Sequence, residues 1–195
     1  VDICTADNAE CEAVCLCDAG FELSRSCALT NEDMLLKMEA REIVLNSLLL
    51  QIYEEDSSRE SIAGLVAQLS DSTQQSDELS ADAAATSWGL CSYIVENAQL
   101  VDLSNDRLLP LLSSVNAVAG SGGNSSATVN QTLALLGRVG STSAANMLPG
   151  EFPVEEVYNT FRVSVSVYDP SQSIIGTNLT ISVPQSTTEA FQSGI

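Results

Sequence analysis

The sequence contains no histidine and a single lysine, Lys37, and each scarcity excludes a class of function. Without histidine there is no Ser-His-Asp triad, no Cys-His dyad and no histidine-containing zinc site. Only 7 Lys and Arg residues stand against 26 Asp and Glu, which gives a formal net charge of −19. We therefore expect no binding to nucleic acid and none to an anionic membrane surface, because both require a basic surface. No run of about 18 apolar residues is present, so no membrane span is expected in this chain.

The chain is nevertheless long and apolar enough to bury a hydrophobic core. It has 195 residues, of which 45% are hydrophobic, and wholesale disorder is not expected. Catalysis by carboxylates alone would need acid pairs such as those in 54–56 or at Glu155-Glu156. Acid clusters at the ends of elements are far more often solvated. We therefore predict that the chain is not an enzyme and assign no catalytic residue.

Six cysteines predict a disulfide framework. Five of them fall within the first 27 residues, and the sixth lies alone in the middle of the chain. An even count with a dense cluster is typical of a protein that folds in an oxidising compartment. The alternative, a metal site made of thiolates, lacks the paired C-x2-C spacing of a zinc ribbon. The predicted disulfide residues are Cys4, Cys11, Cys15, Cys17, Cys27 and Cys91.

The segment 15–21, Cys-Leu-Cys-Asp-Ala-Gly-Phe, followed by Cys27, resembles the C-terminal half of an epidermal-growth-factor-like (EGF-like) module. Gly20 suits the tight turn between the two short strands of that half. The cysteines of the front half are too closely spaced for a complete module, which leaves the pairing open. The resemblance implies a Cys17–Cys27 bridge. Because five is odd, we expect one N-terminal cysteine to pair with Cys91.

Three N-x-[ST] sequons also favour an extracellular or cell-surface location. We expect N-linked glycans and no other cofactor. Calcium stays an open alternative without assigned ligands, because Asp2 resembles the start of a calcium-binding growth-factor-like module whose second acidic ligand is missing here. The chain begins at Val1 without a methionine, so we expect a processed product or a piece of a longer secreted protein. The predicted glycosylation residues are Asn124, Asn130 and Asn178.

Hydrophobic periodicity predicts helices in the middle of the chain and strands near its end. Apolar residues recur at three- and four-residue steps after Thr30, and at two-residue steps after Pro149-Gly150. Helices are predicted from Thr30 to Glu54 or Glu55, from the linker 56–58 through Leu69, from Ser80 through Val95, from Leu108 to Val118 and from about Thr128 to Arg138, with 70–78 as a loop. The segment 30–33 is predicted to cap the first helix, and Pro110 is expected in the first turn of the fourth. Strands are predicted at 161–167 and within 174–183, with a further short strand within 153–158.

These segments predict an α+β fold. It consists of a small disulfide-rich N-terminal module, an α-helical bundle in the middle and a short antiparallel β-sheet at the C-terminus. The predicted domains are 1–29, a partial EGF-like module; 30–148, a helical domain; and 149–195, a β-strand region that forms an incomplete sandwich. Trp88 lies close to Cys91 in the sequence, and we interpret it as a tryptophan packed over a disulfide in the core, in preference to a binding aromatic.

The order of these parts also resembles a known family. Short amphipathic helices, a Ser/Gly/Asn-rich loop, a Pro-Gly-Glu step and the phrases Asn-Thr-Phe-Arg-Val-Ser-Val-Ser at 159–166 and Leu-Thr-Ile-Ser-Val-Pro-Gln-Ser at 179–186 follow one another. They resemble the region between the receptor-for-egg-jelly module and the autoproteolysis-inducing (GAIN) domain of polycystin-like surface proteins, especially those of protists. The resemblance implies a large extracellular glycoprotein with structural, adhesive or mechanical duties. The self-cleavage site of that family contains a histidine, so self-cleavage does not carry over to this sequence.

Two functional hypotheses follow. The first is an extracellular structural glycoprotein module that self-assembles into a fibre or sheath, with copies of itself as its partner. Three or four strands are too few to close a sandwich, so an unpaired edge is expected to accept a strand from a neighbouring copy. The alternative is an ectodomain fragment of a polycystin-like adhesion or mechanosensing receptor.

Overall fold

The computed structural model describes residues 18–20, 28–54, 56–121, 126–167 and 177–182, and the chain divides into two compact units, Val1–Lys37 and Met38–Ile195. Helix α1 (Asn31–Glu54) begins in the first unit and ends in the second. Its predicted N-terminal cap is confirmed, because the Thr30 hydroxyl accepts the Asp33 N–H at 3.1 Å and donates to the Asp33 carboxylate at 2.8 Å.

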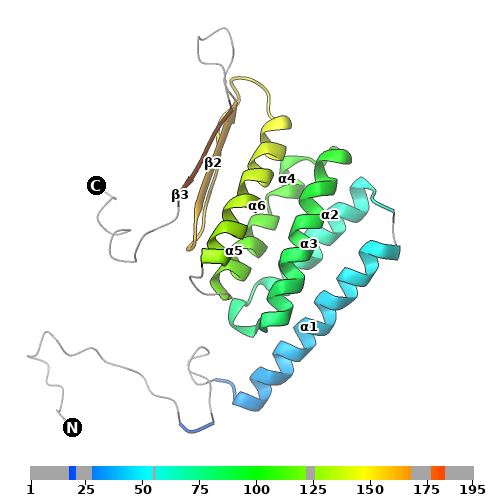
Figure 1. Cartoon of the computed structure of the whole chain (residues 1–195), viewed down its shortest axis with the longest axis vertical. Coiled ribbons are helices and arrows are strands. Elements are labelled where there is room, and N and C mark those ends of the chain that lie inside the picture. The colour runs from blue at the N-terminus through cyan, green and yellow to red at the C-terminus, as the bar shows by residue number, and fades with distance from the viewer. Residues whose placement is uncertain (1–17, 21–27, 55, 122–125, 168–176, 183–195) are drawn as a thin grey trace, which may run out of the picture. The chain divides into compact units, whose positions relative to one another are not determined.

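Four longer helices form most of the second unit (Figure 1). The prediction of a mostly helical chain with a short antiparallel sheet at its C-terminal end is therefore confirmed. Most of the predicted disulfide-rich module lies outside the described residues. The helices of this unit are α2 (Arg59–Thr73), α3 (Ala81–Leu100), α5 (Leu111–Ser121) and α6 (Ser126–Ala145), with the one-turn elements η2 (Ser76–Glu78) and α4 (Asn105–Leu108) between them.

Several helices are longer than their apolar pattern predicts, and α3, for example, runs to Leu100, beyond the predicted Val95. Helix α2 continues into the predicted loop 70–78 and ends at Thr73, which is fully buried and whose hydroxyl donates to the Leu69 carbonyl at 2.9 Å. Helix α6 runs on to Ala145 because small residues, among them Gly140 and Ser143, are buried in its last turns. Small and hydroxyl-bearing residues pack well at close helix contacts, but hydrophobic periodicity does not detect them.

The prediction of one continuous helix from Leu108 to Val118 is wrong. The structure contains two helices in this region, and Pro110 lies between α4 and α5. Proline has no N–H to donate, so the helical hydrogen bonds are interrupted at Pro110, although Leu109 before it keeps helical backbone angles. The predicted single helix would have Pro110 in its first turn. The structure instead ends a first, one-turn helix before it.

A three-stranded antiparallel sheet follows the helices, with β2 (Arg162–Val167) between β1 (Val154–Val157) and β3 (Thr177–Ser182). Val163 is opposite Glu156 of β1 on one side and Ile181 of β3 on the other. Strand β1 confirms the short strand predicted within 153–158, and β3 lies within the range predicted for the return strand.

One face of the sheet belongs to the same hydrophobic core as the helices. Phe161, Val163 and Val165 are at most 2% exposed and join a cluster that includes residues of α2, α3, α5 and α6. Strands β2 and β3 lie against α6 (Figure 1). The alternation of buried and exposed residues along β2 therefore fixes which face of the sheet is turned toward α6 and which is turned away.

A nearly buried ion pair joins α1 to the end of α2 and to η2. The Nε atom of Arg41 lies 2.5 Å from Oε2 of Glu78, and its Nη1 atom donates to the Ser72 carbonyl at 2.7 Å. The side chains of Arg41 and Glu78 are 21% and 4% exposed. Removing one member of a buried pair leaves the other charge without its compensating partner, which is costly in a low-dielectric environment.

We predict that Arg41→Ala lowers the free energy of unfolding by about 3 kcal/mol, because the buried Glu78 carboxylate loses its guanidinium partner. The matched control is Arg59→Ala, which removes an exposed pair with Asp102 (3.9 Å) and is expected to cost less than about 1 kcal/mol. Urea unfolding followed by circular dichroism measures both values. Equal losses in the two variants would contradict the importance of the buried pair.

Candidate functional site

The predicted disulfide residues fall into two groups. Five of them, the N-terminal cysteines, lie outside the described residues, and their pairing stays a prediction. Cys91 lies on α3, where it is a free thiol with 0% exposure. The structure therefore does not contain the bridge expected from Cys91 to an N-terminal cysteine. Burial raises the pKa of the Cys91 thiol from 9.0 to about 12.

We predict that Cys91 reacts with iodoacetamide only after unfolding. Its thiol is buried, and its raised pKa keeps it protonated at pH values at which an exposed thiol would ionise. Raising the pH of the folded protein from 7 to 9 should not speed its labelling. Peptide mapping by mass spectrometry identifies the labelled position. Rapid labelling of Cys91 in the folded state, or its recovery in a disulfide-linked peptide, would contradict the structure.

The predicted glycosylation residues lie on different elements. Asn124 lies outside the described residues, Asn130 is exposed on α6, and Asn178 is in β3. The hydroxyl of Thr132, the third residue of the second sequon, donates to the Thr128 carbonyl at 2.8 Å. Glycan attachment stays a prediction at all three positions.

The acid pair Glu155-Glu156 does not form a catalytic pair in this geometry. The two residues are adjacent on β1 and therefore extend from opposite faces of the sheet. Glu155 is exposed and accepts from the Arg162 guanidinium at 3.1 Å, whereas Glu156 is half-buried on the other face. Among the described residues, no cluster of three or more Cys, Asp or Glu could hold a metal ion.

The candidate functional site is the outer edge of β1, which we define as the backbone of Glu155 and Val157. The Tyr158 N–H donates to the Phe161 carbonyl at 2.9 Å, which makes these two residues a hydrogen-bonded pair. Hydrogen-bonded and non-bonded pairs alternate along an antiparallel ladder. Glu156 is thus bonded to Val163 of β2, and the N–H and C=O groups of Glu155 and Val157 point away from β2.

Side-chain packing on α5 holds the hairpin end of this edge. The Oδ1 atom of Asn116 accepts both the N–H of Thr160 at 3.3 Å and its hydroxyl at 2.8 Å. Next to it, Phe161 is fully buried, and its ring centroid lies 5.1 Å from that of Tyr158. The turn between β1 and β2 is therefore fixed to the helical core.

A tight turn precedes the other end of β1. The Glu151 N–H donates to the Leu148 carbonyl at 3.0 Å, and Gly150 has a φ of +84°. Proline at the second position and glycine with a positive φ at the third are the signature of a type II turn. The Gly150 N–H also donates to the Val167 carbonyl at 3.0 Å, which ties the turn to the end of β2.

The side chains around the edge are apolar and acidic. Phe152, just before β1, is 91% exposed, and Val157 within the strand is 68% exposed. Burial, together with the negative charge and hydrogen bond of Glu156, raises the pKa of Tyr158 to about 12, so its phenol is neutral at physiological pH. An exposed strand edge with neighbouring apolar side chains is suited to pairing with another strand.

Sequence reasoning predicted an unpaired edge from the number of strands but did not locate it. The only local signal was the phrase Pro-Val-Glu-Glu-Val, in which Pro153 precedes the edge strand and two acids lie within it. Proline and charged residues are common on edge strands because they limit uncontrolled pairing.

Comparison of the chain with protein-family models, with curated proteins and with solved structures finds no match. Within the described ranges, no helix combines the length and apolar character that a membrane span needs.

Proposed function

We propose that the chain is an extracellular structural glycoprotein module that assembles with copies of itself by strand addition at β1. The observation that supports this proposal best is the outer edge of β1, whose Glu155 and Val157 backbone groups point away from β2 and have no partner among the described residues. Backbone hydrogen bonds from a neighbour would satisfy these groups. The cysteine cluster and the sequons support the extracellular setting.

The charge of β1 determines which strand is a suitable partner. If β1 paired with β1 of a second copy, the acids Glu155 and Glu156 of the two strands would face one another, and like charges directly opposite each other destabilise a sheet. The other outer strand, β3, has the sequence Thr-Asn-Leu-Thr-Ile-Ser without any charge. We therefore infer that β1 of one copy pairs with β3 of the next.

Such a contact leads to an open assembly. The surface that donates the strand differs from the surface that accepts it, so each added copy presents a new β1 edge, and contacts of this kind give filaments unless the rotation closes a ring. Both β1 and β3 are antiparallel to β2 and thus run in the same direction. A neighbouring copy that is shifted across the strands, without rotation, would therefore place its β3 parallel to β1 of the first copy. The net charge of −19 would keep such filaments apart laterally.

We predict that Val157→Pro weakens assembly while the monomer stays folded. Proline removes the outward N–H of Val157, which β2 does not use, and is tolerated in edge strands. Losing one hydrogen bond of about 1 kcal/mol raises the concentration needed for assembly about fivefold, and more where the ring obstructs the incoming strand. Sedimentation velocity over a concentration series, with electron microscopy of the same samples, measures this shift.

The matched control is Val157→Thr, which keeps the N–H and a β-branched side chain of similar shape. It should assemble at the concentration of the unmodified chain. Circular dichroism of all three proteins at low concentration tests whether the monomers are equally folded. Unchanged assembly of the proline variant, or an unmodified chain that stays monomeric at every concentration reached, would contradict strand addition at β1.

A further inference from the structure

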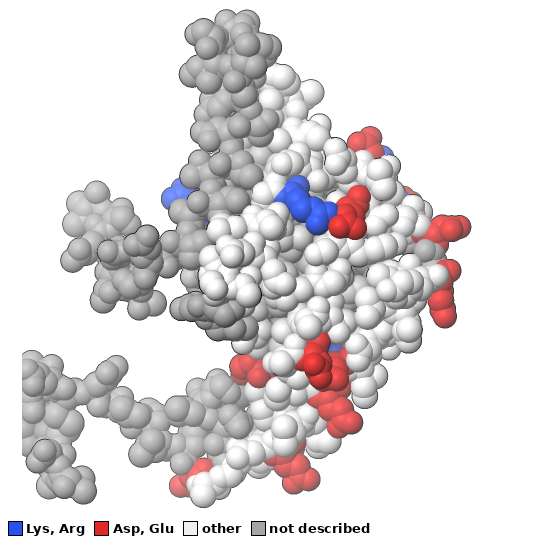
Figure 2. Space-filling model, viewed as in Figure 1, with Lys and Arg blue, Asp and Glu red and all other residues white. Residues whose placement is uncertain are grey.

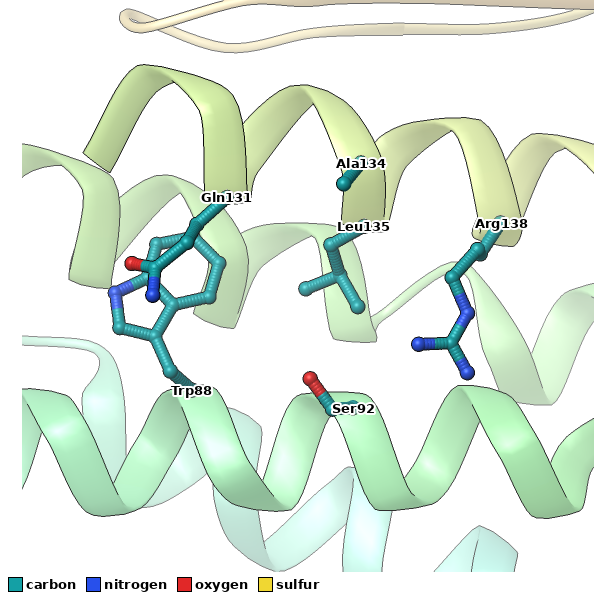
Figure 3. A pocket seen from close by; sticks show the side chains of 6 residues that line it. All are labelled: Trp88, Ser92, Gln131, Ala134, Leu135 and Arg138. Atoms are coloured by element: carbon teal, nitrogen blue, oxygen red, sulfur yellow. The ribbon is translucent and has the colours of Figure 1, made fainter. Parts of the chain in front are cut away.

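A groove lies between helices α3 and α6, on a part of the second unit that the sheet edge does not use. Its first pocket has a volume of about 150 Å³ and is adjoined by a second of about 440 Å³, which shares Ala134 and Arg138 with the first. We call the two together the α3–α6 groove. Figure 3 shows the first pocket with its lining residues: Trp88 and Ser92 of α3 and Gln131, Ala134, Leu135 and Arg138 of α6.

Helical spacing brings the polar groups of the first pocket together. Trp88 and Ser92 are four residues apart on α3, and Gln131 and Arg138 are seven apart on α6, so each pair lies on one face of its helix. The pocket floor is formed by Leu135, which is 4% exposed. In Figure 3 the Ser92 hydroxyl and the Arg138 guanidinium both extend into the space between the helices.

Several of these polar groups have no hydrogen-bond partner within the described part of the chain. The hydroxyl of Ser87, one turn earlier on α3, donates to the Ala83 carbonyl at 2.8 Å, and that of Ser141 on α6 donates to Gly137 at 2.9 Å. The Ser92 hydroxyl makes no such bond, and the Gln131 amide and the Trp88 indole N–H are also without a partner there. Three groups that can donate or accept hydrogen bonds are therefore open to a ligand in one pocket.

The charge around the groove favours a neutral ligand. Arg138 is paired with Glu96 across the groove at 2.9 Å, so its positive charge is already compensated. No Asp or Glu occurs between Arg107 and Gly150, although the chain as a whole is strongly acidic. Figure 2 shows one adjacent pair of basic and acidic groups on a face that is otherwise largely uncharged near it. A small anion would gain little at the paired Arg138 and would approach against the net charge.

We propose that the α3–α6 groove binds a neutral saccharide, with one sugar ring in the pocket beside Trp88. A pyranose ring has an apolar C–H face that packs on an indole, and its hydroxyls both donate and accept, as the Ser92 hydroxyl and the Gln131 amide require. Among the described residues, Arg138 contacts only Glu96, which leaves other N–H donors of its guanidinium for a ligand. A few placed polar groups around an apolar floor are typical of small-ligand sites.

The size of the first pocket sets the size of this ligand. Its 150 Å³ is below the range of about 300–1,000 Å³ that holds drug-sized molecules. It therefore suits one ring, and the second pocket accommodates a linked residue. An extended peptide would require a continuous row of backbone partners, whereas the open groups here converge on one point. This inference is independent of strand addition at β1.

The experiment uses the fluorescence of Trp88, which is the only tryptophan in the chain. The full chain, produced without glycans, is titrated with the methyl glycosides of glucose, galactose, mannose and N-acetylglucosamine. We expect a saturable change in emission with at least one of them. A tripeptide amide and sodium acetate are titrated in parallel as probes for the peptide and anion classes.

Two variants test whether the change in Trp88 fluorescence comes from binding in the first pocket. Ser92→Ala and Gln131→Ala each remove a polar group at a helix position that tolerates alanine, and each should weaken binding about three- to tenfold. Ser47→Ala is the control, because Ser47 is exposed on α1 and its hydroxyl is bonded to the Ile43 carbonyl. Far-ultraviolet circular dichroism tests that all variants are folded. No saturable response to any glycoside, a response only to the peptide or acetate, or equal binding by all variants would overturn the proposal.

Discussion

The packing of one sheet face on α6 is the constraint on which the second unit depends. Phe161, Val163 and Val165 enter the helical core, and Asn116 fixes the hairpin turn to α5. Because β2 lies in the middle, its backbone is paired on both sides, and β1 and β3 become the outer strands. A sheet that is held rigidly on one face presents its outer strands in a fixed orientation, which reduces the entropy cost of adding a strand.

The molecule presents two surfaces of different chemistry. The edge of β1 offers backbone groups next to exposed apolar side chains, with acids that disfavour pairing of two identical strands. The α3–α6 groove offers open side-chain groups in neutral surroundings. Each surface is built on rigid elements, the one on a sheet packed to the core and the other on two long helices. Assembly at one and saccharide binding at the other can therefore be tested separately.

Much of this fold could be predicted from the sequence because the spacing of apolar residues in its helices and strands is regular. The two-residue alternation around Val163 and Val165 predicted β2, and the Thr30 cap predicted the start of α1. Other features depend on tertiary contacts. Burial of Thr73 extends α2 beyond its apolar pattern, and Pro110 divides a helix that the pattern predicted as one.

The candidate sites also depend on tertiary contacts that the sequence pattern does not reveal. Counting strands predicted an open edge, but only the register of β1 on β2 shows which backbone groups point outward. The sequence predicted that Trp88 packs on a disulfide in the core. In the structure Trp88 is half-buried and packs against the hydrophobic core, but Cys91 is a free thiol and Trp88 also lines a groove. That groove requires two helices whose relative position depends on packing, so no local motif in either helix predicts it.

Hydrogen exchange of individual β1 amides, measured by nuclear magnetic resonance, tests the account most directly. In dilute monomer the amides of Glu155 and Val157 should exchange rapidly while that of Glu156, bonded to β2, is protected. On raising the concentration, Glu155 and Val157 should become protected as neighbouring copies add their strands. Slow exchange of Glu155 and Val157 in the dilute monomer would show that the edge is already satisfied within one chain, and would contradict the account.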